Sequence, residues 1–335
     1  MKKICWLATG GTIASRPSEN GLVPGFTAKE MLEMVPNLKD YGHIDCYDIM
    51  QLDSTNLQPE DWQYIAGYIE KLYEQYDGFV ITHGTDTLNW TCCALHYMLE
   101  NLAKPVVVIG SQLTIEEENT DAKFNLNAAF AMASSEKIGV FAVCGGQIIE
   151  GLWAKKLYSE DMRSIQSINK MPVATFEGNN IKWNEYENPQ VNGIFKVHSD
   201  LELKVAQIKI MPGLDSELLF NLAKMGYKGI VIEAYGAGGI PFAKDKQRDI
   251  VGAIEELSKQ GVKIVCTTQC LFDGVHMDRY EVGIKACKAG VIPAGKLSVE
   301  AATVKLMVDL AKNKSYKRQI KKEKLNLNSI SPFFI

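Results

Sequence analysis

Four segments in the first third of the chain share one pattern: a mainly apolar run that passes directly into small polar residues. These runs cover residues 3–8, 44–52, 77–82 and 104–109. Apolar runs of this length, closed by Gly, Ser, Thr or Asp, are typical of buried strands in a parallel sheet. We therefore expect four strands whose carboxyl ends carry polar groups, at the edge where ligands bind in open α/β sheets.

Helical spacing of apolar residues fills the segments between these strands. It predicts a first helix that ends at Val35 and three further helices over residues 58–76, 88–102 and 119–135. The first of them opens on a capping box formed by Thr27 and Glu30. The alternation of strands and helices predicts an α/β fold, with a mostly parallel sheet and helices on both faces.

A second alternating region follows Pro212 and Gly213, after a stretch of mixed polarity that we interpret as a connection. Its patterns predict helices over 215–225, 245–260, 283–289 and 297–312, and strands over 228–233 and 262–266. We therefore predict two domains with a linker. Residues 1–182 form a large N-terminal catalytic α/β domain, 183–204 the linker, and 205–335 a smaller, Rossmann-like C-terminal α/β domain. The lysine-rich tail after Lys312 is predicted to be a solvated helix.

The composition narrows the class of function. The net charge is −4, and no basic run precedes the C-terminus, which argues against nucleic acid or an anionic membrane as partner. No stretch is long enough to span a bilayer, and the N-terminal apolar run passes straight into a glycine turn instead of a cleavage site, so we predict a cytoplasmic protein. The eight cysteines include no CxxC pair and the five histidines are scattered, so no metal and no cofactor is expected.

Two of the strand ends carry the polar residues that are best suited to catalytic chemistry. The first strand ends in Thr9-Gly10-Gly11-Thr12, where two glycines allow a sharp turn and a close approach to a ligand. Taken alone, this motif is more often a plain turn. The polar segment 16–25 after it suits a mobile flap. The third strand runs into His83-Gly84-Thr85-Asp86-Thr87, in which we interpret His83 as a buried, hydrogen-bonded residue.

These residue types favour acyl transfer. No Ser-His-Asp arrangement is evident, which leaves the hydroxyls of Thr12 and Thr85, the carboxylate of Asp86 and one lysine. A threonine hydroxyl is a poor nucleophile unless a neighbouring base takes its proton. A lysine serves as that base only when burial lowers its pKa. Paired lysines such as Lys155-Lys156 are more often on a solvated face, so spacing alone does not identify the base.

The motifs resemble those of a known enzyme family. Residues 8–14, Ala-Thr-Gly-Gly-Thr-Ile-Ala, and residues 78–87, Gly-Phe-Val-Ile-Thr-His-Gly-Thr-Asp-Thr, match the two signatures of the bacterial-type L-asparaginases of the asparaginase/glutaminase family. The chain is most similar to the type I cytoplasmic branch, and the similarity runs through nearly its whole length. Both signatures together, in this order, are highly specific for the family.

The resemblance implies roles for matching positions. Thr12 would attack the side-chain amide carbon of L-asparagine, release ammonia and form a β-aspartyl-enzyme that water hydrolyses. Thr85, Asp86 and Lys156 would form the second catalytic group, with Lys156 as the base acting through Thr85. The predicted substrate-binding residues are Asp53, Ser54, Thr55, Thr85, Asp86 and Ser111. Family members are homo-oligomers, so a homodimer or homotetramer is expected.

The chain departs from the family pattern in the flap, and two alternative functions are also considered. Leu22 stands in the flap where the family usually has a tyrosine that contacts the nucleophile, so another group activates Thr12 or activity is lower. The first alternative is an ammonia-generating subunit of a tRNA-dependent amidotransferase. Such subunits carry an extra N-terminal domain, for which the signature beginning at Ala8 leaves no room, so we do not expect it. The second is a catalytically weak amino-acid-binding homologue, against which the intact threonine, aspartate and lysine set argues.

Overall fold

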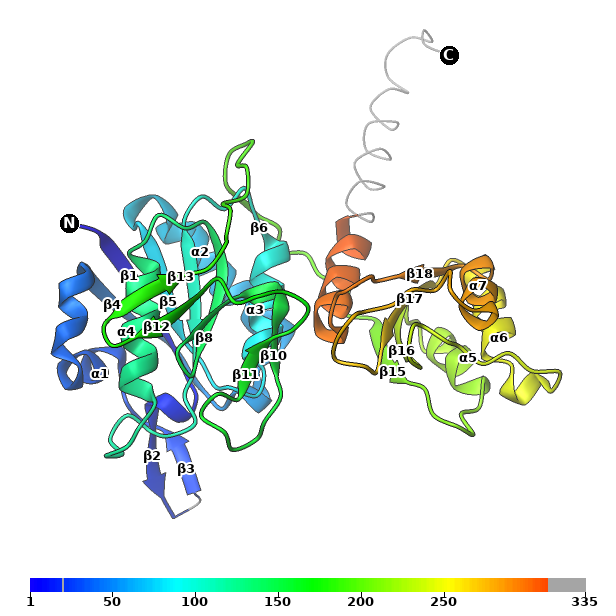
Figure 1. Ribbon diagram of the computed structural model, residues 1–335, viewed down its shortest axis with the longest axis horizontal. Coiled ribbons are helices and arrows are strands. Elements are labelled where there is room, and N and C mark those ends of the chain that lie inside the picture. The colour runs from blue at the N-terminus through cyan, green and yellow to red at the C-terminus, as the bar shows by residue number, and fades with distance from the viewer. Residues whose placement is uncertain (20, 313–335) are drawn as a thin grey trace, which may run out of the picture. The chain divides into compact units, whose positions relative to one another are not determined.

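The computed structural model describes residues 1–19 and 21–312, which form two compact units (Figure 1). The first unit comprises Met1–Ser199, Leu271–Gly274 and Lys296–Ala301, and the second comprises Asp200–Cys270, Val275–Gly295 and the described residues from Ala302 on. Each unit is built on its own sheet, so the predicted two-domain α/β fold is confirmed. The tail that was predicted to be a solvated helix lies outside the described residues, and the exact domain bounds stay a prediction.

The first unit contains an eight-stranded sheet in the order β13-β12-β9-β8-β7-β5-β1-β4. Its strands are β1 (Lys3–Gly10), β4 (His43–Leu52), β5 (Gly78–Thr82), β7 (Pro105–Ile109), β8 (Gly139–Cys144), β9 (Gln147–Glu150), β12 (Ala174–Glu177) and β13 (Asn180–Trp183). The five neighbouring strands β8, β7, β5, β1 and β4 run parallel to one another. Strands β9, β12 and β13 follow in antiparallel pairs, each with its neighbour. The four strands predicted from their polar ends are neighbours, so their carboxyl ends meet at one edge.

Four helices of the first unit lie within the expected segments but are shorter than expected. They are α1 (Ala28–Met34), α2 (Pro59–Leu72), α3 (Leu88–Met98) and α4 (Ala122–Ala133). The capping box at Thr27 and Glu30 is confirmed. The predicted end of the third helix at Leu102 is wrong. Residues Leu99–Glu100 leave the helix as β6, which pairs with β14 (Lys196–Val197), and Asn101 takes a positive φ of 55° that a helix does not allow.

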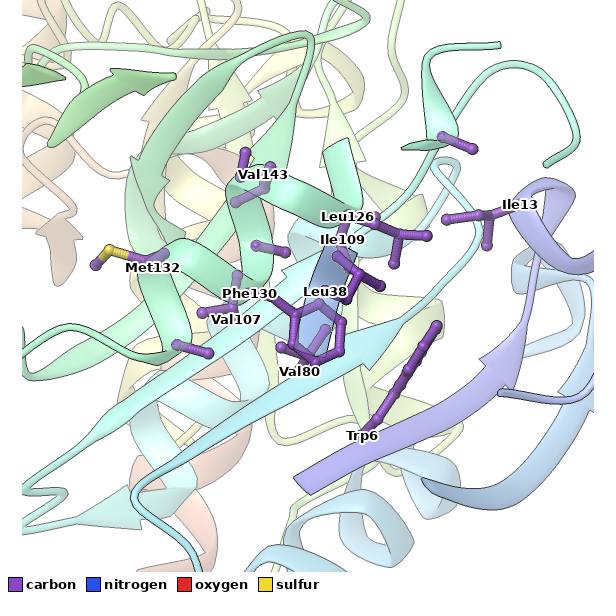
Figure 2. Packing of buried hydrophobic residues seen from close by; sticks show 14 of the residues in the cluster. Trp6, Ile13, Leu38, Val80, Val107, Ile109, Leu126, Phe130, Met132 and Val143 are labelled. Carbon is purple, nitrogen blue, oxygen red and sulfur yellow. The ribbon is translucent and has the colours of Figure 1, made fainter. Parts of the chain in front are cut away.

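Helices cover both faces of this sheet, as predicted. On one face, Trp6 of β1 and Phe130 of α4 pack edge to face with ring centroids 5.2 Å apart, among buried aliphatic side chains such as Val80 and Ile109 (Figure 2). The neighbour of Val80, Phe79, points to the opposite face and stacks on Tyr73, just after α2. Each fully buried side chain of this size contributes about 1.5–3 kcal/mol to stability.

Besides the pair of β6 and β14, two more short ribbons lie outside the eight-stranded sheet. The segment predicted as a flap forms a hairpin of β2 (Ser15–Ser18) and β3 (Gly21–Pro24). The lysine pair lies on β10 (Ala154–Lys156), which pairs antiparallel with β11 (Ile165–Ser167). The edge strand β13 forms just before the predicted linker, because Asn180–Trp183 pairs with β12 despite its mixed polarity.

The second unit has a four-stranded parallel sheet in the order β15-β16-β17-β18. Its elements are β15 (Val205–Lys209), α5 (Glu217–Lys224), β16 (Gly229–Ala234), α6 (Ile250–Lys259), β17 (Lys263–Thr268), α7 (Glu281–Lys288) and β18 (Val291–Pro293). Sequence patterns missed β15 and β18. Within residues 1–19 and 21–312, no helix has the length and apolar character needed to cross a bilayer.

Candidate active site

Close backbone contacts bring the polar strand ends of the first unit together. Gly11 has φ 80° and ψ 176°, a conformation open almost only to glycine, and a Cβ on it would lie 2.3 Å from the backbone nitrogen of Gly84. A Cβ on Gly84 would in turn lie 2.5 Å from Ser54 Oγ, and one on Gly110 would lie 2.9 Å from Cγ2 of Thr85. The glycines therefore let four loops, after β1, β4, β5 and β7, meet in one place.

Thr12 follows this contact directly. Strands β1 and β5 are paired neighbours in parallel register, with Ala8 opposite Thr82, so Thr12 and Thr85 each come a few residues after the same point of the sheet edge. The Gly11 N–H donates to the carbonyl of Leu52 at 2.9 Å, which ties the turn to the end of β4. The Thr12 side chain is half-buried at the start of a short 3₁₀ turn, Thr12–Ala14.

We expect Gly11→Ala to destabilise the first unit by about 3 kcal/mol, since it combines a strained backbone with a clash against backbone atoms that cannot rotate away. Urea unfolding measures the change. Gly178→Ala is the matched control: Gly178 has φ 64°, but nothing lies within 4 Å of its added Cβ, so only about 1 kcal/mol is expected. Equal losses in the two variants would show that the contact with Gly84 is not tight.

Thr85, Asp86 and Lys156 form one hydrogen-bonded group. Lys156 Nζ donates to Thr85 Oγ1 at 2.8 Å and to Asp86 Oδ1 at 2.5 Å, although the lysine lies 71 residues after Thr85. Thr85 is buried, the Lys156 side chain is 19 % exposed and Asp86 is half-exposed. In this group the Thr85 hydroxyl is held by the Lys156 amine, and the Asp86 carboxylate faces solvent. Such an arrangement suits proton transfer next to a charged ligand.

The structure separates the two candidate lysines. Lys155 and Lys156 are consecutive on β10, so their side chains point to opposite faces of the ribbon. Lys156 reaches Thr85, whereas Lys155 forms an ion pair with Glu300. Only one of the two lysines therefore contacts the predicted catalytic threonine.

The loop after β4 presents the predicted substrate-binding residues. Asp53 Oδ1 accepts hydrogen bonds from the Thr55 amide and hydroxyl, both at 2.8 Å, and so closes the turn that starts Ser54–Asn56. The Ser54 carbonyl accepts from the Thr87 hydroxyl at 2.8 Å. Ser54 is 3 % exposed, and its Oγ has no hydrogen-bond partner among the described residues. A buried hydroxyl without a partner costs free energy, and a bound ligand can recover it.

The loop after β7 contributes a contact that the sequence analysis did not name. Gln112 Oε1 accepts from the Thr85 hydroxyl at 3.2 Å, and its amide nitrogen donates to the Ser159 carbonyl at 2.7 Å. Its position directly after a predicted strand end was the available signal. The hydroxyl of the neighbouring Ser111 donates to the Leu113 carbonyl at 2.6 Å, within its own loop. Its predicted role in substrate binding stays a prediction.

His83 is a buried structural residue, as interpreted from the sequence. Its Nδ1 lies 2.8 Å from the Gly84 carbonyl and its Nε2 lies 2.9 Å from the Thr91 hydroxyl. Because a carbonyl only accepts, Nδ1 carries the proton and Nε2 accepts from Thr91. Burial lowers the pKa of His83 to about 4, so the ring is neutral near pH 7 and holds the loop instead of transferring protons.

No metal site is evident in the described part of the chain, where no three His, Cys, Asp or Glu side chains gather closely enough to bind an ion. All eight cysteines are free thiols. The groups available for chemistry at the strand ends are therefore the threonine hydroxyls, the two aspartate carboxylates and the Lys156 amine.

Comparison with known proteins decides the family. The model described as "Asparaginase, N-terminal" matches residues 3–189, and the "Glutaminase/Asparaginase C-terminal domain" model matches residues 204–322. The chain belongs to the asparaginase family. Both of its α/β units are therefore those of an asparaginase-family hydrolase.

Individual members of the asparaginase family extend this finding. The L-asparaginase of Thermococcus kodakarensis is 39 % identical over 307 residues, 91 % of this chain and 92 % of that protein. The match to the solved structure of that enzyme covers 92 % of this chain and 93 % of the other chain, with a TM-score of 0.86. L-asparaginase I from Vibrio cholerae is 30 % identical, with 96 % of each chain covered and a TM-score of 0.81. A glutamyl-tRNA(Gln) amidotransferase subunit of Pyrococcus abyssi is 35 % identical over 92 % of this chain and 72 % of that protein.

Proposed function

We propose that the chain is an L-asparagine amidohydrolase, which converts L-asparagine to L-aspartate and ammonia through a threonine acyl-enzyme. The observation that carries this proposal is the contact of Lys156 Nζ with both Thr85 Oγ1 and Asp86 Oδ1, beside the glycine turn that bears Thr12. Similarity to L-asparaginases over more than nine-tenths of the chain supports it. A cytoplasmic location and a homodimeric or homotetrameric assembly stay predictions.

In the first step, Thr12 Oγ1 attacks the side-chain carboxamide carbon of asparagine. The hydroxyl proton passes to the leaving nitrogen, the C–N bond breaks, ammonia departs and a β-aspartyl ester forms on Thr12. In the second step, Lys156 accepts through Thr85 the proton of a water molecule that attacks the ester. The ester C–O bond to Thr12 breaks, aspartate leaves, and the proton held by Lys156 passes back to Thr12 Oγ1, which restores the hydroxyl and the free amine.

The charges around the group fit a zwitterionic amino acid. Asp86 is half-exposed and carries the negative charge that the α-ammonium group requires. The unpartnered Ser54 hydroxyl and the turn closed by Asp53 and Thr55 form the opposite, hydrogen-bonding side, suited to the α-carboxylate. Fixing both ends of the substrate orients its amide toward Thr12 before reaction. The Gly11 N–H is already donated to Leu52, so it is not free to bind the developing oxyanion.

Leu22 bears on how Thr12 is activated. It lies on the hairpin opposite Pro17, its side chain is 52 % exposed, and it has no group that exchanges protons. The flap therefore lacks, at this position, the tyrosine phenol that the family usually has. We propose that proton transfer from Thr12 uses the leaving amide or solvent, at a lower rate than a positioned phenol would give.

Ammonia release from L-asparagine by the purified chain tests the proposal. We expect stoichiometric ammonia and L-aspartate without any added protein, RNA or metal, and β-aspartyl hydroxamate when hydroxylamine replaces water as acceptor, because an ester intermediate can be trapped. L-Glutamine and D-asparagine in parallel define the substrate preference. If L-asparagine releases no ammonia, the proposed function is wrong, whatever the result with the other two amides.

A second candidate is the ammonia-generating component of a tRNA-dependent amidotransferase. The similarity to glutamyl-tRNA(Gln) amidotransferase subunits, over 72 % of the length of the Pyrococcus abyssi protein, favours it as the alternative. Such a protein would release little ammonia from free asparagine by itself. The assay with the isolated chain therefore separates the two candidates, since only an independent asparaginase turns over asparagine alone.

A further inference from the structure

The ribbon that carries Lys156 has little support of its own. Strand β10 has three residues and, among the described strands, pairs with β11 alone, in a two-stranded sheet separate from the main one. Two-stranded ribbons are marginally stable in water without additional packing. The ribbon therefore depends on packing: β10 contacts helix α3, and Ala154 of β10 and Ile165 of β11 are fully buried. Any further contact to β10 also bears on how Lys156 reaches Thr85.

Glu300 provides that support on the reverse face of the ribbon. Its Oε1 accepts a hydrogen bond from Lys155 Nζ, and the two residues are 145 positions apart in the sequence. Glu300 is 7 % exposed and the Lys155 side chain 19 %, so the ion pair is largely screened from water. This ion pair joins Lys155, the neighbour of Lys156, to residues 296–301, a segment of the first unit that is distant in sequence.

The surroundings of the Glu300 carboxylate favour its negative charge but leave one of its oxygens unpaired among the described residues. It lies in the first turn of the helix that starts at residue 299, where the Ala301 amide donates to the Ser298 hydroxyl at 3.1 Å. A negative charge is favoured in the first turn of a helix. The second oxygen, Oε2, is buried and has no partner in the described part of the chain, so Lys155 is the one group that satisfies this carboxylate.

Glu300 also lies near helix α3, which begins directly after the Thr85 loop. Burial raises the pKa of the Cys93 thiol on α3, and the charge of Glu300 raises it further while Lys155 lowers it. The ion pair therefore lies next to both elements that flank the catalytic group: α3, which follows Thr85 and Asp86, and β10, which carries Lys156.

We propose that Glu300 is a positioning residue, which holds Lys155 and thereby fixes β10 so that Lys156 reaches Thr85. Lys155 and Lys156 alternate across the same three-residue strand, so a shift of one moves the other. Displacement of a catalytic group by about 1 Å can reduce turnover by about 10²-fold. This inference rests on the proposed function, in which Lys156 is the base.

The test compares Glu300→Gln, which keeps the shape and removes the charge, with a matched control. We expect kcat for L-asparagine to fall by about tenfold or more while KM changes by less than about twofold, because the residues proposed to bind substrate lie on the loops after β4, β5 and β7 and not on β10 itself. Glu300→Asp and Lys155→Arg, which keep the ion pair, should retain more of kcat than Glu300→Gln. Glu150→Gln, which removes the acidic partner of Lys170 elsewhere in the unit, should leave kcat unchanged.

A purely structural role would give a different outcome. It would lower the unfolding midpoint of Glu300→Gln but leave kcat per folded molecule at the wild-type value, and that result would overturn the proposal. The double variant Lys155→Met with Glu300→Leu covers the case in which the single variant does not fold, since apolar replacement of a buried ion pair is often tolerated. Wild-type kcat in the double variant would also overturn it.

A crystal structure of Glu300→Gln supplies a measurement that does not depend on activity. We expect Lys156 Nζ to lie beyond hydrogen-bond distance of Thr85 Oγ1, compared with 2.8 Å in the wild-type chain. If the wild-type protein releases no ammonia from asparagine, the proposed function fails, and this distance alone decides whether Glu300 positions Lys156. An unchanged distance contradicts the inference.

Discussion

Thr12→Ala is expected to lower turnover of L-asparagine by at least about 10³-fold, because no acyl-enzyme can form without the nucleophilic hydroxyl. The side chain is half-buried at a loop, so the loss of one hydroxyl and one methyl should change the free energy of unfolding by only about 1 kcal/mol. Ammonia release under saturating asparagine measures the first quantity, and urea unfolding measures the second.

Thr12→Ser is the matched control for this variant. It keeps a hydroxyl at the same position and should retain measurable activity and hydroxylamine trapping. Wild-type activity in Thr12→Ala would show that the nucleophile lies elsewhere, with the hydroxyl of Thr85 as the next candidate.

Lys156→Met should reduce kcat by about 10²–10⁴-fold, the range typical of losing a positioned general base. Methionine preserves the length of the side chain but neither accepts a proton nor pairs with Asp86. Because Thr12 remains, the acyl-enzyme can still form, and a rapid-mixing experiment should show that deacylation, the step in which Lys156 is the proposed base, is slowed more than acylation.

Lys156→Arg separates charge from proton transfer. Arginine keeps a positive charge next to Asp86, but it does not deprotonate in proteins and so cannot act as a base. We expect it to be almost as inactive as Lys156→Met. Wild-type kcat in the arginine variant would mean that Lys156 contributes only its charge to the site.

The sequence predicted the part of the fold that depends on local pattern. The runs that became β1, β4, β5 and β7 are dominated by apolar residues and end in polar ones, and the structure places them as neighbours. The sequence pattern did not predict some of the shorter strands. The four residues of β13 have mixed polarity, and pairing with β12, not their own pattern, makes them a strand. Helix α3 ended early for the same reason, because Leu99–Glu100 pairs with β14.

The site was predictable where residues stand at strand ends and not where distant segments meet. Thr12, Thr85 and Asp86 follow strands and were named from the sequence. The choice between Lys155 and Lys156 came from family resemblance, because spacing alone favoured a solvated face for both. Gln112 and Glu300 were missed, since their contacts with Thr85 and Lys155 join segments 27 and 145 residues apart that no periodicity relates.

The wide separation of these contacts in the chain has a consequence for biosynthesis. Chains fold from the N-terminus as they are made, and the strands that carry Thr12 and Thr85 are complete by residue 82. The amine that contacts Thr85 arrives only with residue 156, and its carboxylate support with residue 300. A nascent chain on the ribosome can therefore hold a largely formed sheet and still lack hydrolytic capacity until residue 300 has been made.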